Sequence, residues 1–224
     1  MSSYAAPVNA EFVPTVRFDG DEADRAKQHW SGIGVKPFYG KPKPWARFMA
    51  EAILRHSPAT VLEFGCNVGR NLATIRDSAP DVRLLGLDIN ADAVAAAQAQ
   101  GLDARVGDET TLTRFADNEV DVSFTVSVLD HLPDPRPAIT ELCRVSSRAV
   151  LLLEPWMGEE GKVVRNTRAE TGETVDTTPY SYSWDYERLV PEVAPGWRLH
   201  AEPHPLGPTN LGPYYWFYAV TPVT

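Results

Sequence analysis

The chain has 224 residues, 43% of them hydrophobic, which is enough for one α/β domain with additions. A formal net charge of −9 argues against nucleic acid as the main partner, and the absence of a membrane-length apolar run argues against a membrane. Two cysteines form no disulfide framework, and no signal peptide is read at the N-terminus, so we expect a cytoplasmic protein. The composition leaves the oligomeric state open.

The first quarter of the chain precedes the regular core. Residues 1–20 have mixed polarity and no period, so we expect a flexible arm. Residues 21–30 are expected to form one short acidic helix, and the glycine- and proline-rich residues 31–44 a loop. Residues 44–56 then have the apolar stripe of an amphipathic helix, with a proline at the first turn.

The middle of the chain alternates short apolar runs with helical segments, the pattern of a doubly wound parallel sheet. The expected strands cover residues 61–64, 82–87, 102–106, 120–126 and 149–153, and the expected helices cover residues 68–78, 91–100 and 135–145. Asn90 can cap the second of these helices, and Gly101 ends it. Because the crossovers are right-handed, the loops that leave the strands lie along one edge of the sheet.

The last third departs from this alternation. Residues 156–182 are polar, mixed in charge and too long for an ordinary connection, so we expect an inserted cap. A short helix over 184–190 follows, and residues 197–202 and 214–221 have the character of two final strands.

The stretch from Val61 to Asn71 carries the clearest functional pattern. A buried strand is followed by a tight turn between Gly65 and Gly69, and then by the start of a helix. Free backbone N–H groups in such a turn form a concave surface that suits a nucleotide-like ligand. Glu63, at the end of the strand, would repel a diphosphate and attract an amino group. The glycine spacing also differs from the Gly-x-Gly-x-x-Gly fingerprint of dinucleotide folds.

This stretch resembles motif I of the class I S-adenosylmethionine-dependent methyltransferases, whose usual form is acidic-x-Gly-x-Gly-x-Gly. The sequence departs from that form at Asn67, which stands at the middle glycine. Asparagine tolerates the left-handed backbone region, so the turn can survive the change. Cys66 lies within the same turn, where we expect it to contact the cofactor without any reactivity of its own. The alternative is an ordinary strand-to-helix turn.

Acidic residues follow the second and third expected strands. A carboxylate at Asp88 can accept both hydroxyls of a ribose, and Ile89 can cover one face of a purine. The alternative for Asp88 is an acid at a helix start, favoured by the helix dipole. The resemblance implies that Asp108 accepts a hydrogen bond from the adenine amino group, and the neighbouring Glu109 is the alternative.

Residues 120–135 resemble the strand-four segment of the same family, which often ends in Leu-x-His-Leu-x-Asp. The resemblance implies that backbone groups near Ser127 support the methionine part of the cofactor and that the strand end faces the acceptor. A neutral imidazole at His131 could take a proton from a hydroxyl or an amine. The alternative is that His131 only caps or packs at the next helix. Asp130 could orient His131 or act alone.

The resemblance implies a Rossmann-like, mostly parallel sheet with an antiparallel closing strand, all in a single domain over residues 21–224. It also implies that residues 21–56 form a helical lid segment, with the cap at residues 156–182. Aromatic residues gather in these additions and could stack on a planar or apolar acceptor, although some must pack within the cap. The candidates are Trp30, Phe38, Tyr39, Trp156, Tyr180, Tyr182, Trp184 and Tyr186.

The resulting expectation is an enzyme that transfers a methyl group from S-adenosylmethionine to a small-molecule acceptor in secondary or intermediary metabolism, leaving S-adenosylhomocysteine. The five histidines are scattered, so no metal site is expected. One alternative is a protein that uses the sulfonium for another reaction, such as cyclisation, and another is a binding protein without turnover. A nicotinamide-dependent oxidoreductase is disfavoured by Glu63. The sequence leaves open whether oxygen, nitrogen or carbon is methylated.

Overall fold

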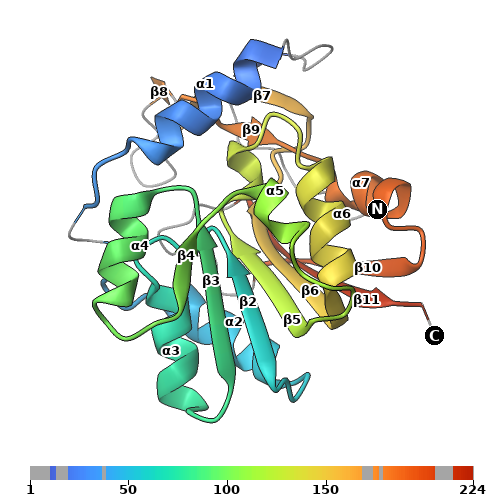
Figure 1. Ribbon diagram of the computed structural model, residues 1–224. Helices are drawn as coiled ribbons and strands as arrows, with labels where there is room; N and C mark the ends of the chain where they lie inside the picture. Colours follow the sequence, from blue (N-terminus) through green and yellow to red (C-terminus); the bar gives the residue numbers. More distant parts are fainter. Residues whose placement is uncertain are drawn as a thin grey trace.

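Seven strands form the central sheet in the computed structural model of the chain (Figure 1), which describes residues 11–13, 20–36, 39–167, 174–176, 179–204 and 214–223. The strands are β2 (Thr60–Phe64), β3 (Arg83–Asp88), β4 (Ala104–Val106), β5 (Val120–Val126), β6 (Ser146–Pro155), β10 (Trp197–Pro203) and β11 (Tyr215–Pro222). Their order is β10-β11-β6-β5-β2-β3-β4. The five strands from β2 to β6 are parallel, while β11 runs antiparallel to β6 and to β10. The predicted mostly parallel sheet with an antiparallel closing strand is therefore confirmed.

Helices connect these strands and cover both faces of the sheet (Figure 1). They are α2 (Pro44–Leu54), α3 (Arg70–Ser78), α4 (Ala91–Gln98), α5 (Glu109–Leu112), α6 (Arg136–Val145) and α7 (Tyr186–Val193), with a 3-10 turn at Leu129–His131. Along β2, Leu62 packs on the face covered by α6 and α7, while Val61 packs on the face covered by α2, α3 and α4. Successive strand residues point to opposite faces, so an apolar run such as this one fills both layers of the core.

A second, smaller sheet corrects two sequence expectations. It contains β1 (Glu11–Val13), β7 (Gly161–Thr167), β8 (Thr174–Asp176) and β9 (Tyr182–Ser183), with β7 paired to the other three. The expectation of a loose arm is wrong for β1, because its backbone pairs with β7; the rest of residues 1–19 lies outside the described residues. The insertion after β6 contains β7, β8 and the start of β9, although its polar sequence had indicated only a long cap.

The helix α1 (Gly20–Ser31) lies beside this smaller sheet, across the edge where the parallel strands end (Figure 1). Glu22 fixes it there, because its Oε1 accepts hydrogen bonds from Lys162 Nζ on β7 and Tyr182 Oη on β9, each at 2.6 Å. The carboxyl ends of β2, β3, β4 and β5 thus have a helical cover. In open α/β sheets this edge is the usual ligand site.

Candidate active site

A cavity of about 730 Å³ lies between α1 and the carboxyl ends of the parallel strands. Its volume falls within the range of about 300–1,000 Å³ that is typical of small-molecule sites. Most of the residues predicted from the sequence to contact ligands line it: Trp30, Tyr39, Glu63, Gly65, Cys66, Asn67, Asp88, Ile89, Asp108, Glu109, Ser127 and His131. The fold therefore brings four separate strand ends to one space.

The turn after β2 has the backbone that its sequence predicts. Gly65, Asn67 and Gly69 have positive φ angles of 77°, 48° and 78°. Asn67 stabilises its own left-handed conformation, since its Oδ1 accepts a hydrogen bond from the Val68 N–H at 2.8 Å. This local bond is the physical reason that asparagine can stand where the related motif has glycine. Gly69 caps α3 but does not line the cavity.

Glu63 is a buried carboxyl group in the cavity wall. Its Oε1 accepts a hydrogen bond from Asn71 Nδ2 at 2.6 Å, and its Oε2 has no hydrogen-bond partner among the described residues. Burial raises the pKa of this carboxyl to about 8, and the hydrogen bond from Asn71 and the nearby charge of Arg70 oppose that rise only in part. A ligand ammonium group would favour the ionised form and satisfy the second oxygen.

Asp88 holds the turn and the next helix together. Its Oδ2 accepts from the Asn67 N–H at 2.7 Å, and its Oδ1 accepts from the Asn90 N–H at 2.8 Å. Burial raises the pKa of this half-buried carboxyl, and the two backbone donors oppose the rise. Each carboxylate oxygen has a second lone pair, so Asp88 can still accept from a ribose hydroxyl. Asn90 caps α4 as predicted, with its Oδ1 accepting from the Ala93 N–H at 3.0 Å.

Lys27 of α1 occupies the edge of the cavity beside the two acids proposed for adenine. Its Nζ lies 2.8 Å from Asp108 Oδ2 and 2.6 Å from Glu109 Oε1. Burial would raise the pKa of Asp108, but hydrogen bonds from Lys27 and Thr110 outweigh it and lower that pKa to about 2. The position of Lys27 is not visible in the sequence, because nothing in a short acidic helix shows which of its cations reaches a strand end.

His131 faces the cavity from the 3-10 turn after β5. Its ring lies against the Trp30 indole, with 3.8 Å between ring centroids, and its Nδ1 lies 3.3 Å from the Tyr180 carbonyl oxygen. Burial lowers the pKa of His131 to about 4, against a smaller opposing effect of the Tyr180 carbonyl. The imidazole is therefore neutral at neutral pH. When Nδ1 donates its proton to Tyr180, Nε2 is the hydrogen-bond acceptor.

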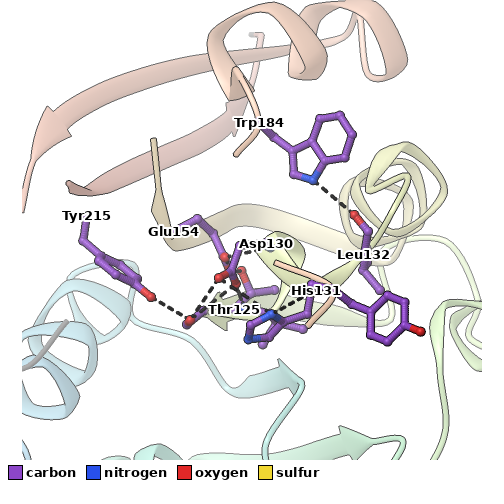
Figure 2. Close-up of polar contacts among 10 residues, drawn as sticks. Thr125, Asp130, His131, Leu132, Glu154, Trp184 and Tyr215 are labelled. Atoms are coloured by element: carbon purple, nitrogen blue, oxygen red, sulfur yellow. Dashed lines mark hydrogen bonds and ion pairs between the residues drawn. The ribbon is translucent and has the colours of Figure 1, made fainter. Parts of the chain in front are cut away.

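Tyr186, one of the aromatic candidates, is buried on α7 and does not line the cavity. Three candidates from the insertion do not line it either: Trp156, Tyr180 and Tyr182. Tyr182 is 1% exposed and bonded to Glu22, Trp156 packs against the core, and Tyr180 contributes its backbone carbonyl to His131. Their segment folds into the smaller sheet and therefore packs on α1. Phe38 lies outside the described residues. Trp184 does line the cavity, with its Nε1 donating to the Leu132 carbonyl at 3.1 Å (Figure 2).

The described part of the chain has neither a metal-binding cluster nor a membrane-spanning helix. Within it, no group of three or more His, Cys, Asp and Glu side chains has an arrangement that could hold a metal ion. No helix in the same residues is long and apolar enough to cross a membrane.

Residues 62–152 match a family model described as Methyltransferase domain. This stretch is a methyltransferase domain. The match begins in β2 and ends in β6, so it includes the carboxyl ends of β2, β3, β4 and β5, from which the cavity is lined. The resemblance to S-adenosylmethionine-dependent methyltransferases is confirmed, and S-adenosylmethionine is the cofactor of that family.

Several solved structures share the fold of this chain. One is a SAM-dependent methyltransferase from Aquifex aeolicus, with a TM-score of 0.57 and 18% identity over 92% of this chain and 100% of that one. The plantazolicin methyltransferase BamL, in complex with an analogue and SAH, has a TM-score of 0.58 and 12% identity over 90% of each chain. The [4+2]-cyclase SpnF has a TM-score of 0.58 and 16% identity over 80% of this chain and 82% of its own. The chain spans about half the length of some other matched proteins.

Proposed function

We propose that the protein transfers a methyl group from S-adenosylmethionine to a small-molecule acceptor. One observation carries this proposal: the cofactor turn and the neutral His131 line the same cavity, beneath α1. The cofactor would supply an electrophilic methyl group on a positively charged sulfur. The protein then has to hold the two reactants in line, remove a proton and exclude water.

The polar groups of the cavity fit this cofactor. Glu63 has an oxygen that no described residue hydrogen-bonds, which suits the ammonium of an amino acid. Asp88 can accept from ribose hydroxyls, and Ile89 in the same wall can cover a purine. Asp108 or Glu109 would accept from the adenine amino group if Lys27 shared or released them. Backbone groups at Ser127 and the side chain of Cys66 complete the wall.

His131 is the proposed general base. A neutral imidazole whose Nδ1 donates to the Tyr180 carbonyl can accept the proton of a hydroxyl or amine at Nε2. Trp30 and the rest of α1 cover this position, which would limit the access of water. We therefore assign α1, within the segment 21–56, the role of a lid over the acceptor.

A small acceptor is supported by the enclosed volume and by aromatic walls that include Trp30, Tyr39 and Trp184. The name of the plantazolicin methyltransferase refers to a natural product, and the net charge of −9 disfavours nucleic acid. The cyclase SpnF shares the fold, so cyclisation is the rival activity. The parallel sheet alone does not separate these two reactions.

Two measurements test the proposal. Titration calorimetry should show binding of S-adenosylhomocysteine and no heat with NAD; tight NAD binding alone would refute the cofactor assignment. A panel of phenolic, amine and carbonyl metabolites is then incubated with the protein and S-adenosylmethionine, and the masses of the products are measured by mass spectrometry. A mass gain of one methylene with release of S-adenosylhomocysteine supports methyl transfer. A product of unchanged mass without that release would favour cyclisation.

A matched pair of variants tests the base. His131→Asn should abolish methylation of an oxygen or nitrogen acceptor and leave the affinity for S-adenosylhomocysteine unchanged, because His131 is assigned to the acceptor. His200→Asn, the same change on an exposed strand position, should leave both properties unchanged. Full turnover by His131→Asn would show that His131 is only structural.

A further inference from the structure

Two carboxyl groups lie buried behind the wall that carries His131 (Figure 2). Asp130, on the 3-10 turn, is 6% exposed, and Glu154, on β6, is fully buried. Neither one lines the cavity. Among the described residues, neither forms an ion pair with a lysine or an arginine. The neutral imidazole of His131 lies beside the pair, with its Nδ1 3.8 Å from Asp130 Oδ2.

Hydrogen bonds connect this acid pair to the end of β5. Glu154 accepts from Thr125 Oγ1 at 2.7 Å and from the Val128 N–H at 3.1 Å. The Asp130 N–H also donates to Glu154 Oε2, at 3.4 Å. Asp130 accepts a longer bond from Ser127 Oγ at 3.3 Å. The donors can therefore support one buried negative charge much better than two.

The other titratable groups that face the pair are tyrosines. Tyr186 comes from α7, and Tyr215 and Tyr218 come from β11. Burial raises the pKa of each, so all three are neutral. Tyr215 Oη is 2.7 Å from Ser127 Oγ, and Tyr186 Oη is buried without a hydrogen-bond partner among the described residues.

Two desolvated carboxylates without a compensating cation would cost several kcal/mol or more, so a pair of this kind keeps a proton. Burial raises the pKa of Asp130 to about 7. Burial and the charge of Asp130 raise the pKa of Glu154 well above its ordinary value. Near neutral pH the pair therefore goes from neutral to one negative charge as the pH rises. His131 has already lost its proton at this pH.

We propose that Asp130 and Glu154 share one proton behind His131 and form the ionisable unit that stabilises the protonated imidazole. The catalytic meaning rests on the proposed function. In that reaction the acceptor's bond to hydrogen breaks and the proton goes to His131 Nε2. The electron pair left on the acceptor forms the new bond to the methyl carbon, and the old carbon–sulfur bond breaks with its electrons on sulfur.

The positive charge that begins on sulfur ends on the imidazole in this step. The negative charge of the acid pair, one ring away from the reacting nitrogen, offsets it. Glu154 does not touch the cavity, so it is a positioning residue that acts through Asp130. Its role is to set the pH at which Asp130 becomes negative.

The test follows the histidine ring signals by NMR across the pH range, with the His131 signal identified from its loss in His131→Asn. In the ligand-free protein, the His131 signal should show an inflection near pH 7 that reports the acid pair. When the pair goes from neutral to singly negative, the carboxyl that stays protonated donates a hydrogen bond to the charged one. An amide donates more weakly, so Asp130→Asn or Glu154→Gln should raise that midpoint by about half a pH unit or more. Glu192→Gln, the same change on an exposed face, should leave it in place.

No inflection between roughly pH 5 and 9 in the unmodified protein would overturn the proposal. So would an unchanged midpoint in a folded variant of either acid, and one folded variant is sufficient for this decision. The measurement needs no cofactor and no acceptor. Its failure is therefore distinct from failure of S-adenosylhomocysteine to bind, which would refute the proposed function.

Discussion

Gly65 allows a quantitative test of the turn that begins the cofactor site. Its φ is +77°, and a Cβ atom built there would lie 2.3 Å from Val128 Cγ2 and 2.7 Å from Val128 Cγ1. An L-residue in the left-handed region costs roughly 1–2 kcal/mol. Forcing an extra carbon into a packed site costs roughly 1–3 kcal/mol more. Gly65→Ala should therefore reduce the free energy of unfolding by roughly 2–5 kcal/mol.

Gly101 provides a matched control for the backbone part of this cost. Its φ is also +77°, but no atom lies within 4 Å of a Cβ built there. Gly101→Ala should cost only roughly 1–2 kcal/mol. Adding Val128→Ala to Gly65→Ala removes both clashing methyl groups, although the Val128 Cβ itself would remain 3.0 Å away. The double variant should therefore regain most of the unfolding free energy that Gly65→Ala loses through the clash with Val128.

Urea denaturation of the four proteins measures these differences, and calorimetry with S-adenosylhomocysteine measures the effect on the site. Since Gly65 lines the cavity, Gly65→Ala should also weaken cofactor binding, and Gly101→Ala should not. Equal losses of unfolding free energy in Gly65→Ala and Gly101→Ala would refute the reasoning, because they would show that the contact with Val128 contributes nothing.

Three other changes have defined outcomes. Asp88→Ala should weaken S-adenosylhomocysteine binding by on the order of 2 kcal/mol, while Asp92→Ala, on an exposed position, should not; equal affinities in calorimetry would exclude the ribose role. Hydrogen bonds lower the pKa of Glu22 to about 2 despite its burial, so its stabilising effect is present above pH 4.5 and lost as the pH falls to about 2. Urea titrations of Glu22→Gln should show a weaker pH dependence in that interval, and an unchanged slope would contradict this. Trp30→Ala should expose His131 and raise its pKa from about 4, and an NMR titration that finds no change would show that the indole is not the source of burial.

The central sheet and the cofactor turn were predictable because their signals are local. A strand buried on both faces reads as a continuous apolar run, and the Gly65–Gly69 bracket marks the turn that follows it. Asn67 was a departure from the related motif, yet its left-handed conformation follows from a property of asparagine itself. The carboxyl ends of parallel strands then had to meet at one edge.

The rest of the site depends on contacts between distant parts of the chain. Lys27 lies 81 residues from Asp108, and Glu22 lies 160 residues from Tyr182. No sequence period or motif predicts that either pair is in contact. The pairing of β1 with β7 was missed for the same reason, since a strand of three residues is too short to be predicted without knowledge of the strand that it pairs with. No sequence pattern singles out Glu154, and only the fold places it against Asp130.

The helix α1 connects these separate features. In its first turn, Glu22 binds Lys162 of the smaller sheet. In its middle, Lys27 contacts the acids after β4, and in its last turn Trp30 packs on His131. The Asn90 amide adds a further tie, because Nδ2 donates to the Ile33 carbonyl at 2.7 Å, just beyond the helix. A ligand that displaced Lys27 would therefore act on the same rigid element that buries the proposed base. In the proposed reaction, cofactor binding and the environment of His131 would therefore be linked through one helix, whichever atom received the methyl group.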